Sequence, residues 1–479
     1  MKIPTAIVPL AMLASYATAA DAEIRPDETA IAFVSEAGDT VDAFEGHLSV
    51  PENRNDTDSR EITLKYVRFP ATGDTPGAPI IYLSGGPGGS GIQAAKYQRF
   101  PLFMAMREFG DVIALDQRGT GASNDLPNCT SSQHVSVTEP TSDSEFFALE
   151  RAAFAECLDY WKSENIDVRG YTTTQSVADL DALRAHLGAE KVDLWGISYG
   201  SHLSLAALQQ IDDRIGRVVI TAVEGLDQTV KQPLRGDQYF DRLQAAIDSV
   251  PAAKAKYPDV KALIARVLGQ LEADPLQLEI PMRDGGTAPF LLQKRDLQKV
   301  TSALISDPAR AVWILEVYRA LDAGDTAPAI ALLQRAVDPT DTALSFRPMT
   351  VLMDVASGSG AERREMITHQ AQTALMGRHM NFSMHLETVD PSLDLGDTFR
   401  TAPSSNVPTL VITGTLDGRT YPESGQEATA GLSNRQTVIV ENGGHNVFMQ
   451  SPEITELIQD FMRGEAVDGR EIYVDLPEF

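Results

Sequence analysis

The fold is decided by one stretch, Val192-Asp193-Leu194-Trp195-Gly196-Ile197-Ser198-Tyr199-Gly200. It begins as a short apolar strand and ends in a G-x-S-x-G turn, and a helix-like run follows over residues 201–208. Strand, tight turn and helix in this order are the context that a nucleophile elbow requires. Side chains at Gly196 and Gly200 would collide with neighbouring backbone in so sharp a turn, and glycine avoids that collision. We therefore predict that the turn exposes the Ser198 hydroxyl at a helix N-terminus, where developing negative charge is favoured.

Further strand-like runs alternate with helical spacing along the chain. Thr174 or Ser176 is expected to cap one of the helices, over residues 177–187. This alternation indicates an α/β fold, a parallel sheet with helices on both faces. The strand-like runs lie at residues 43–50, 61–69, 78–83, 111–115, 217–222, 408–413 and 436–440.

The domain organisation follows from where the strand signal is interrupted. Between residues 224 and 402 it nearly vanishes and helical spacing dominates, which predicts an inserted, mostly helical cap. Residues 21–223 then form the first part of the core, and residues 403–479 form the second part. A longer excursion with a helix near residues 145–164 is expected within the first part.

A glycine-rich run, Ser84-Gly85-Gly86-Pro87-Gly88-Gly89-Ser90-Gly91, follows the predicted strand at residues 78–83. Its backbone N–H groups can approach a ligand closely, but it has no G-K-[ST] ending and no ribose-binding acid behind a G-x-G-x-x-G. With a candidate serine nucleophile downstream, an oxyanion-binding loop fits better, and a plain flexible turn is the alternative. Asp116 and Arg118, after the strand at residues 111–115, are expected to hold the loop beside the glycine-rich run in place, and contact with the substrate is the alternative.

Three polar side chains fall in loops that follow predicted strands: Ser198, Asp417 and His445. Their order along the chain is that of the α/β-hydrolase fold, and reactive groups gather at the carboxyl ends of parallel strands. His445 would take the proton of Ser198, while Asp417 would orient the imidazole and stabilise its charged form. The backbone N–H groups of Tyr199 and Gly86 are the predicted oxyanion donors.

Composition and charge restrict the partners and the compartment. The chain has 479 residues and a formal net charge of -27, which disfavours binding to nucleic acid and to anionic membranes. Residues 1–20 resemble a secretory signal peptide with Ala17-Thr18-Ala19 as a cleavage site, and a buried N-terminal helix is the alternative. No later run is apolar enough to span a membrane. We expect a periplasmic or extracellular protein with no membrane contact in its mature form.

The two cysteines, Cys129 and Cys157, are expected to form a disulfide in an oxidising compartment, and two buried thiols are the alternative. No zinc-like spacing of Cys and His and no H-E-x-x-H motif occurs in the sequence. We therefore expect no metal and no cofactor.

The same motifs also resemble a known family. Segments 85–88, 116–123, 196–200, 414–418 and 443–445 are similar to the prolyl and tripeptidyl aminopeptidases, which are α/β-hydrolase serine peptidases, and to their secreted tripeptidyl-aminopeptidase-like branch. The resemblance covers residues 40–465 and implies a mostly parallel eight-stranded sheet, a helical cap and release of residues from peptide N-termini. The aromatic-rich cap motif of proline iminopeptidases is absent at residues 223–227, so strict proline specificity is not implied.

These observations predict a secreted serine aminopeptidase acting on peptides. An esterase or amidase acting on small molecules, or a catalytically inactive binding protein, are the alternatives. An exopeptidase must also recognise a free α-amino group, which a sheltered carboxylate can bind. Glu224, directly after a predicted strand, and Asp354, in an apolar run, are the candidates for this role. Alternatively, Glu224 caps a helix and Asp354 pairs with an arginine.

Overall fold

A computed structural model describes residues 25, 27–124, 126–283, 285–340, 342–381 and 383–479 of the chain. The signal peptide expected over residues 1–20 lies outside these residues. Within the described ranges, no helix is both long enough and apolar enough to cross a membrane.

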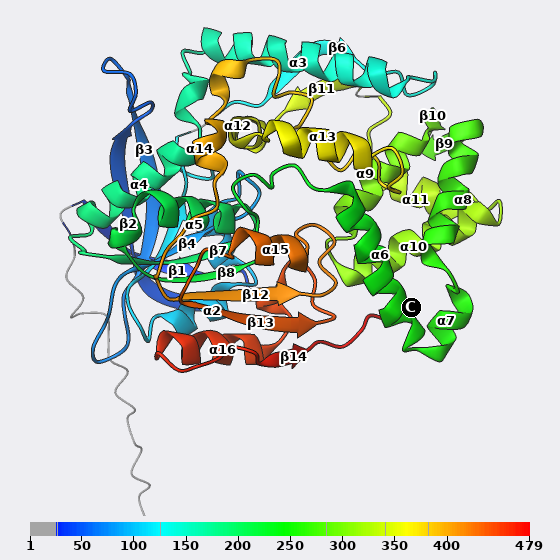
Figure 1. Cartoon of the computed structure of the whole chain (residues 1–479). Helices are drawn as coiled ribbons and strands as arrows, with labels where there is room; N and C mark the ends of the chain where they lie inside the picture. Colours follow the sequence, from blue (N-terminus) through cyan, green and yellow to red (C-terminus); the bar gives the residue numbers. More distant parts are fainter. Residues whose placement is uncertain (1–24, 26, 125, 284, 341, 382) are drawn as a thin grey trace, which may run out of the picture.

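A ten-stranded sheet runs through the core (Figure 1). Its strand order is β1-β2-β3-β5-β4-β7-β8-β12-β13-β14. The pairings from β1 to β5 are antiparallel, and those from β5 to β14 are parallel. The strands are β1 (Glu28–Val34), β2 (Thr40–Pro51), β3 (Glu61–Phe69), β4 (Ile80–Leu83), β5 (Val112–Asp116), β7 (Val192–Ile197), β8 (Ile215–Thr221), β12 (Thr409–Gly414), β13 (Arg435–Glu441) and β14 (Glu471–Tyr473).

The mostly parallel sheet of an α/β-hydrolase is confirmed, but it has ten strands rather than eight. The sequence analysis did not predict β1 and β14, which form the two edges of the sheet. β14 has only three residues, too few to show an alternating pattern.

Helices cover both faces of the sheet because successive strand residues point to opposite sides. Leu194 packs in one apolar cluster with α4 (Thr173–His186) and α5 (Tyr199–Gln210). Trp195 packs in the other cluster with α2 (Phe100–Met106) and α16 (Pro452–Met462). β4, β5, β7 and β12 are buried along their whole length, which explains their continuous apolar sequences.

The helix expected at residues 177–187 begins earlier than predicted. Thr172, rather than Thr174 or Ser176, caps α4, because its side chain accepts a hydrogen bond from the Gln175 N–H. Two shorter helices complete the core, α1 (Gly91–Lys96) and α15 (Pro422–Ala428).

Between β8 and β12 the chain forms a mostly helical segment beside the sheet (Figure 1). It has its own apolar cluster, which includes Tyr239, Leu315 and Tyr318. It also contains a hairpin of β9 (Leu276–Pro281) and β10 (Thr287–Leu292). The helices of this segment are α6 (Pro233–Asp248), α7 (Pro251–Lys256), α8 (Val260–Ala273), α9 (Lys294–Leu304), α10 (Pro308–Asp322), α11 (Ala327–Ala336), α12 (Pro348–Ser357), α13 (Ala361–Gln370) and α14 (Gly396–Arg400).

The excursion at residues 124–169 packs onto this inserted segment. Its strand β6 (Cys129–His134) pairs antiparallel with β11 (Ala343–Phe346), and its helix α3 (Asp143–Ser163) lies against both strands (Figure 1). The sequence analysis had placed the excursion with the core. The predicted disulfide is present: Cys129 joins Cys157 across a Cα–Cα distance of 5.6 Å and ties β6 to α3.

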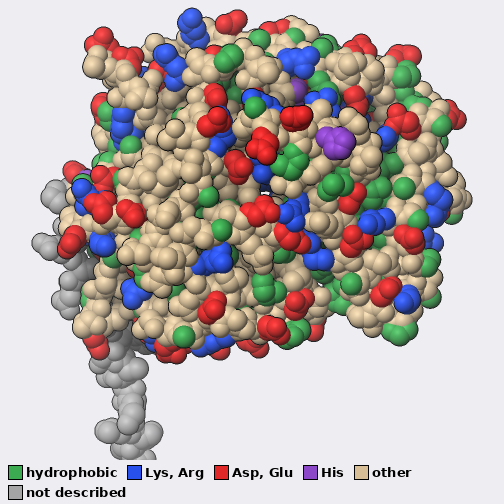
Figure 2. Space-filling model, in the orientation of Figure 1, with side chains coloured by type: hydrophobic (Ala, Val, Ile, Leu, Met, Phe, Trp, Pro, Cys, Tyr) green, Lys and Arg blue, Asp and Glu red, His purple; other side chains and the backbone are tan. Residues whose placement is uncertain are grey.

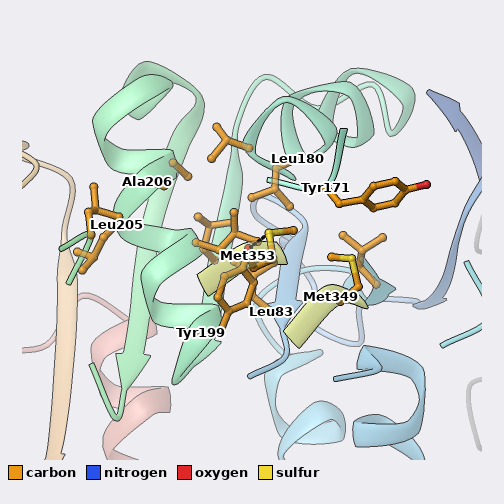
Figure 3. Packing of buried hydrophobic residues seen from close by; sticks show 14 of the residues in the cluster. Leu83, Tyr171, Leu180, Tyr199, Leu205, Ala206, Met349 and Met353 are labelled. Carbon is orange, nitrogen blue, oxygen red and sulfur yellow. Dashed lines mark hydrogen bonds between the residues drawn. The ribbon is translucent and has the colours of Figure 1, made fainter. Parts of the chain in front are cut away.

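α12 attaches the inserted segment to the core beside the elbow turn. Its Met349 and Met353 pack in the same apolar cluster as Leu83, Leu180 and Tyr199 (Figure 3). The Tyr199 hydroxyl lies 3.1 Å from Met353 Sδ. Because Tyr199 is the first residue of α5, this contact joins α12 directly to the helix that follows the elbow.

Candidate active site

The elbow turn has a strained backbone at Ser198. Ser198 follows β7 directly and has φ 56° and ψ −123°, a region that residues other than glycine rarely adopt. Its N–H donates to the Thr221 carbonyl at 3.1 Å, and its carbonyl accepts from the Ser201 hydroxyl at 2.6 Å. These hydrogen bonds stabilise the turn at the carboxyl end of the parallel strands.

The glycines around the turn are required by close backbone contacts. A Cβ at Gly196 would lie 2.5 Å from the Gly200 carbonyl oxygen, and a Cβ at Gly200 would lie 2.0 Å from the Leu83 carbonyl oxygen. A Cβ at Gly85 would lie 3.0 Å from the Ser198 Cβ, so the glycine-rich loop runs directly against the serine. The steric reason for G-x-S-x-G is thus confirmed.

His445 and Asp417 lie together in the loops that follow β13 and β12. His445 Nδ1 is 2.9 Å from Asp417 Oδ2, and the Thr420 hydroxyl donates to the same oxygen at 2.5 Å. The N–H groups of Arg419 and Thr420 donate to Asp417 Oδ1 at 2.7 and 2.9 Å. Burial favours the neutral acid, but His445 and these hydrogen bonds outweigh it and hold the pKa of Asp417 below its usual value. The ionised carboxylate is therefore held in position to orient the imidazole.

Ser198 and His445 line one pocket of about 760 Å³. Gly86, which has φ 124°, lines the same pocket. Tyr199 begins α5, so its backbone N–H has no acceptor within the helix. The structure thus brings together the serine, the histidine with Asp417 behind it, and the glycine loop.

Two family models match the chain. The model described as "alpha/beta hydrolase fold" matches residues 78–268, and the model described as "TAP-like protein" matches residues 394–473. The chain has the α/β-hydrolase fold. The second match falls on the part of the chain that carries Asp417 and His445.

Three curated relatives agree with the family resemblance of the motifs. The chain is 31% identical over 225 residues to "Serine protease Hip1" of Mycobacterium tuberculosis (strain ATCC 25618 / H37Rv), covering 44% of this chain and 41% of that relative. It is 27% identical over 229 residues to "Tripeptidyl aminopeptidase" of Streptomyces lividans, covering 46% and 41%. It is 28% identical over 158 residues to "Probable proline iminopeptidase" of Streptomyces coelicolor (strain ATCC BAA-471 / A3(2) / M145), covering 33% and 36%. The chain spans less than half the length of each.

Asp116 and Arg118 of the core have structural partners, and they do not pair with each other. Asp116 accepts hydrogen bonds from the Ser90 hydroxyl at 2.5 Å and from the Ala122 N–H at 2.7 Å. Arg118 makes a bidentate ion pair with Asp179, both contacts being 2.7 Å. The Asp116 carboxylate thus connects its own loop to the end of the glycine-rich loop, as expected.

Glu224 and Asp354 are not among the described residues that line the pocket. Glu224 is buried and forms an ion pair with Lys231, and the N-cap of the next helix, α6, is Gln232 rather than Glu224. Burial and the neighbouring Glu224 raise the pKa of Asp354 to about 8. Both acids are buried and absent from the pocket lining, and no arginine forms an ion pair with Asp354 in the described part of the chain.

The sequence analysis missed the charged groups that line the pocket beside His445. They are Arg99, Glu150, Lys299, Arg347 and Arg419. Arg419 is two residues from Asp417 and could have been suspected on that ground. The others lie on α3, on α9 and beside α2 and α12, where no motif marks them.

Proposed function

We propose that the protein is an exported serine exopeptidase that cleaves peptides near their free N-termini, an aminopeptidase of the prolyl or tripeptidyl type. The observation that carries this proposal is that Ser198, on its strained elbow, opens into the same pocket as His445, which is bonded to the buried Asp417. This geometry supports nucleophilic attack by the serine.

In the proposed reaction, His445 removes the hydroxyl proton of Ser198 as the oxygen attacks the peptide carbonyl carbon. Asp417, held by His445 and Thr420, keeps the imidazole in one tautomer and stabilises its charged form. The N–H groups of Tyr199 and Gly86 are the proposed donors to the oxyanion. His445 then protonates the leaving amine, and water hydrolyses the acyl-enzyme by the reverse sequence of proton transfers.

The names of the relatives favour a peptide substrate. The chain is similar to proteins named serine protease, tripeptidyl aminopeptidase and proline iminopeptidase. An esterase or amidase acting on small molecules is the second candidate, because the same machinery cleaves esters and amides. A non-catalytic binding role is the remote alternative, since Ser198, His445 and Asp417 supply the side chains that the proposed attack requires.

In this proposal residues 224–402 serve as a cap over the pocket. Residues from this segment, among them Ser302, Thr350 and Met380, line the pocket with the core residues. The excursion adds Glu150 of α3 to that lining. The disulfide favours an oxidising compartment, periplasmic or extracellular, for the mature protein.

The free amine of the substrate requires an acidic partner. We retain Glu224 and Asp354 as candidates and add Glu150, because it is the acidic residue among the described residues that line the pocket. Glu150 already lies 2.7 Å from His385 Nε2 and 3.9 Å from Lys299 Nζ. Glu150→Gln, Glu224→Gln and Asp354→Asn should be compared, and the variant of the true anchor should raise KM for free-amine peptides far more than for neutral esters.

Cleavage of matched peptides with free and acetylated N-termini tests the proposal. We expect free-amine peptides to be cleaved and acetylated peptides to be poor substrates, with turnover lost in Ser198→Ala. Equal cleavage of both sets of peptides, or cleavage of small esters alone, would favour the alternative function of an esterase or amidase. Failure of a fluorophosphonate to label Ser198 would instead support the alternative of a non-catalytic binding role.

A further inference from the structure

The pocket is far more basic than the protein as a whole. The chain has a net charge of -27, and acidic and basic side chains are interspersed over the face seen in Figure 2. The pocket, in contrast, is lined by Arg99, Lys299, Arg347 and Arg419, and Glu150 is the only carboxylate among the described lining residues. A concave, partly sheltered site lined by one sign of charge concentrates ligands of the opposite sign.

Three of the four cations have no carboxylate partner among the residues that the structure describes. Glu150 lies 3.9 Å from Lys299. Arg99 donates to the Tyr82 hydroxyl at 2.8 Å and to Asn446 Oδ1 at 2.6 Å, and both acceptors are neutral. The Arg347 and Arg419 side chains make no hydrogen bond or ion pair with any described residue.

The acids behind Arg419 do not neutralise it. Glu224 is paired with Lys231, whose positive charge compensates its own. Asp354 is protonated at neutral pH, because burial and the charge of Glu224 raise its pKa to about 8. Neither acid therefore forms an ion pair with Arg419, which lines the pocket that contains Ser198 and His445.

We propose that Arg347 and Arg419 bind a carboxylate of the substrate, so that the protein prefers peptides with a negative charge near the scissile bond. This inference rests on the proposed peptidase function and adds a substrate class to it. A guanidinium matches a carboxylate with two parallel hydrogen bonds. Arg419 follows Asp417 in the core, and Arg347 precedes α12 in the inserted segment. The carboxylate site therefore spans both parts of the molecule.

The carboxylate has two possible sources, the C-terminus of a short peptide or an Asp or Glu side chain. Comparing tetra-alanine that ends in a free carboxylate with tetra-alanine that ends in an amide tests the C-terminal carboxylate alone. Amidated alanine peptides with Glu or Gln at each position in turn isolate the second. We expect at least one acidic peptide to exceed its neutral counterpart in kcat/KM by about tenfold or more, the effect of hydrogen bonds between charged groups. High salt should reduce the preference.

The variants Arg347→Gln and Arg419→Gln should each weaken this preference and, combined, should bring the acidic-to-neutral ratio to within about threefold of one. Cleavage of the neutral peptides should change much less. Arg283→Gln, an exposed arginine in the β9–β10 turn, is the matched control and should keep the full preference. Circular dichroism and thermal melting verify that each variant is folded.

Equal cleavage of the acidic and neutral members of every pair would overturn the inference while leaving the peptidase function intact. A preference that survives in the double variant would also overturn it. If the protein cleaves none of the peptides, the proposed function fails. Calorimetric binding of the same pairs to the Ser198→Ala protein then tests the charge preference by itself.

Discussion

At the scale of single residues, Ser198 combines a strained backbone with a position beside His445 in the pocket. We predict that Ser198→Ala lowers kcat on the order of a millionfold, because the members of a triad act as a unit. Asp417→Asn should cost about ten-thousandfold, since the amide favours the wrong imidazole tautomer. Steady-state kinetics on a cleaved peptide measures both effects. Ser249→Ala, at an exposed position, is the control, and near-normal turnover of Ser198→Ala would disprove the assignment.

Thr420 is a second prediction at this scale. Its hydroxyl donates to Asp417 Oδ2 and lies 3.2 Å from His445 Nδ1. Thr420→Val keeps the shape but removes the donor, so we expect kcat to fall roughly ten- to a hundredfold, the effect of one hydrogen bond to a charged group. Thr420→Ser restores the hydroxyl and should recover most of the activity. Equal activities of the Val and Ser variants would show that the hydroxyl is dispensable.

At the scale of elements, the disulfide fastens α3 to β6, and β6 pairs with β11 of the inserted segment. Replacing Cys129 and Cys157 by alanine should lower the free energy of unfolding by roughly 3–4 kcal/mol, the chain-entropy effect for a loop of this length. Urea denaturation measures the change. Mass spectrometry of the non-reduced, digested protein detects the disulfide directly. Two alkylatable thiols in the native exported protein would show that the disulfide is absent.

At the scale of the whole molecule, the buried Asp354 makes stability depend on pH. Its pKa is about 8 when folded, because of burial and Glu224, and about 3.9 when unfolded. Between these values the folded protein binds a proton that the unfolded chain has released, so the free energy of unfolding falls as pH rises. Below about pH 4 Asp354 is protonated in both states, so it does not lower the free energy of unfolding there.

Asp354→Asn should remove this fall, because the amide resembles the protonated acid. The stability of the variant relative to the parent should therefore increase from pH 5 to pH 8, by at most about 1.4 kcal/mol per pH unit. Denaturation curves at several pH values measure the difference, with the exposed Asp274→Asn as the control substitution. Parallel stability profiles of parent and Asp354→Asn would contradict the prediction.

The sequence by itself determined the elements with strong local signals. The elbow was predictable because a side chain at either of its glycines would collide with atoms only a few residues away or on the adjacent strand. The burial of β5, β7 and β12 was predictable because a strand covered on both faces has a continuous apolar sequence. Asp417 and His445 were predictable as neighbours because parallel strands place their carboxyl ends at one edge of the sheet.

Only the tertiary structure decided which charged groups face the pocket and which are paired behind it. Glu224 directly follows a core strand, which favoured it as the partner of the substrate amine, yet it forms an ion pair with Lys231. Glu150 lines the pocket, although the excursion that carries it has no functional motif. The pairing of β6 with β11 also joins distant residues, as the hydrogen bond from Ser131 to the Leu344 carbonyl shows. Periodicity reports only the face on which a residue lies, whereas the partner of a buried charge is set by contacts between segments far apart in the chain.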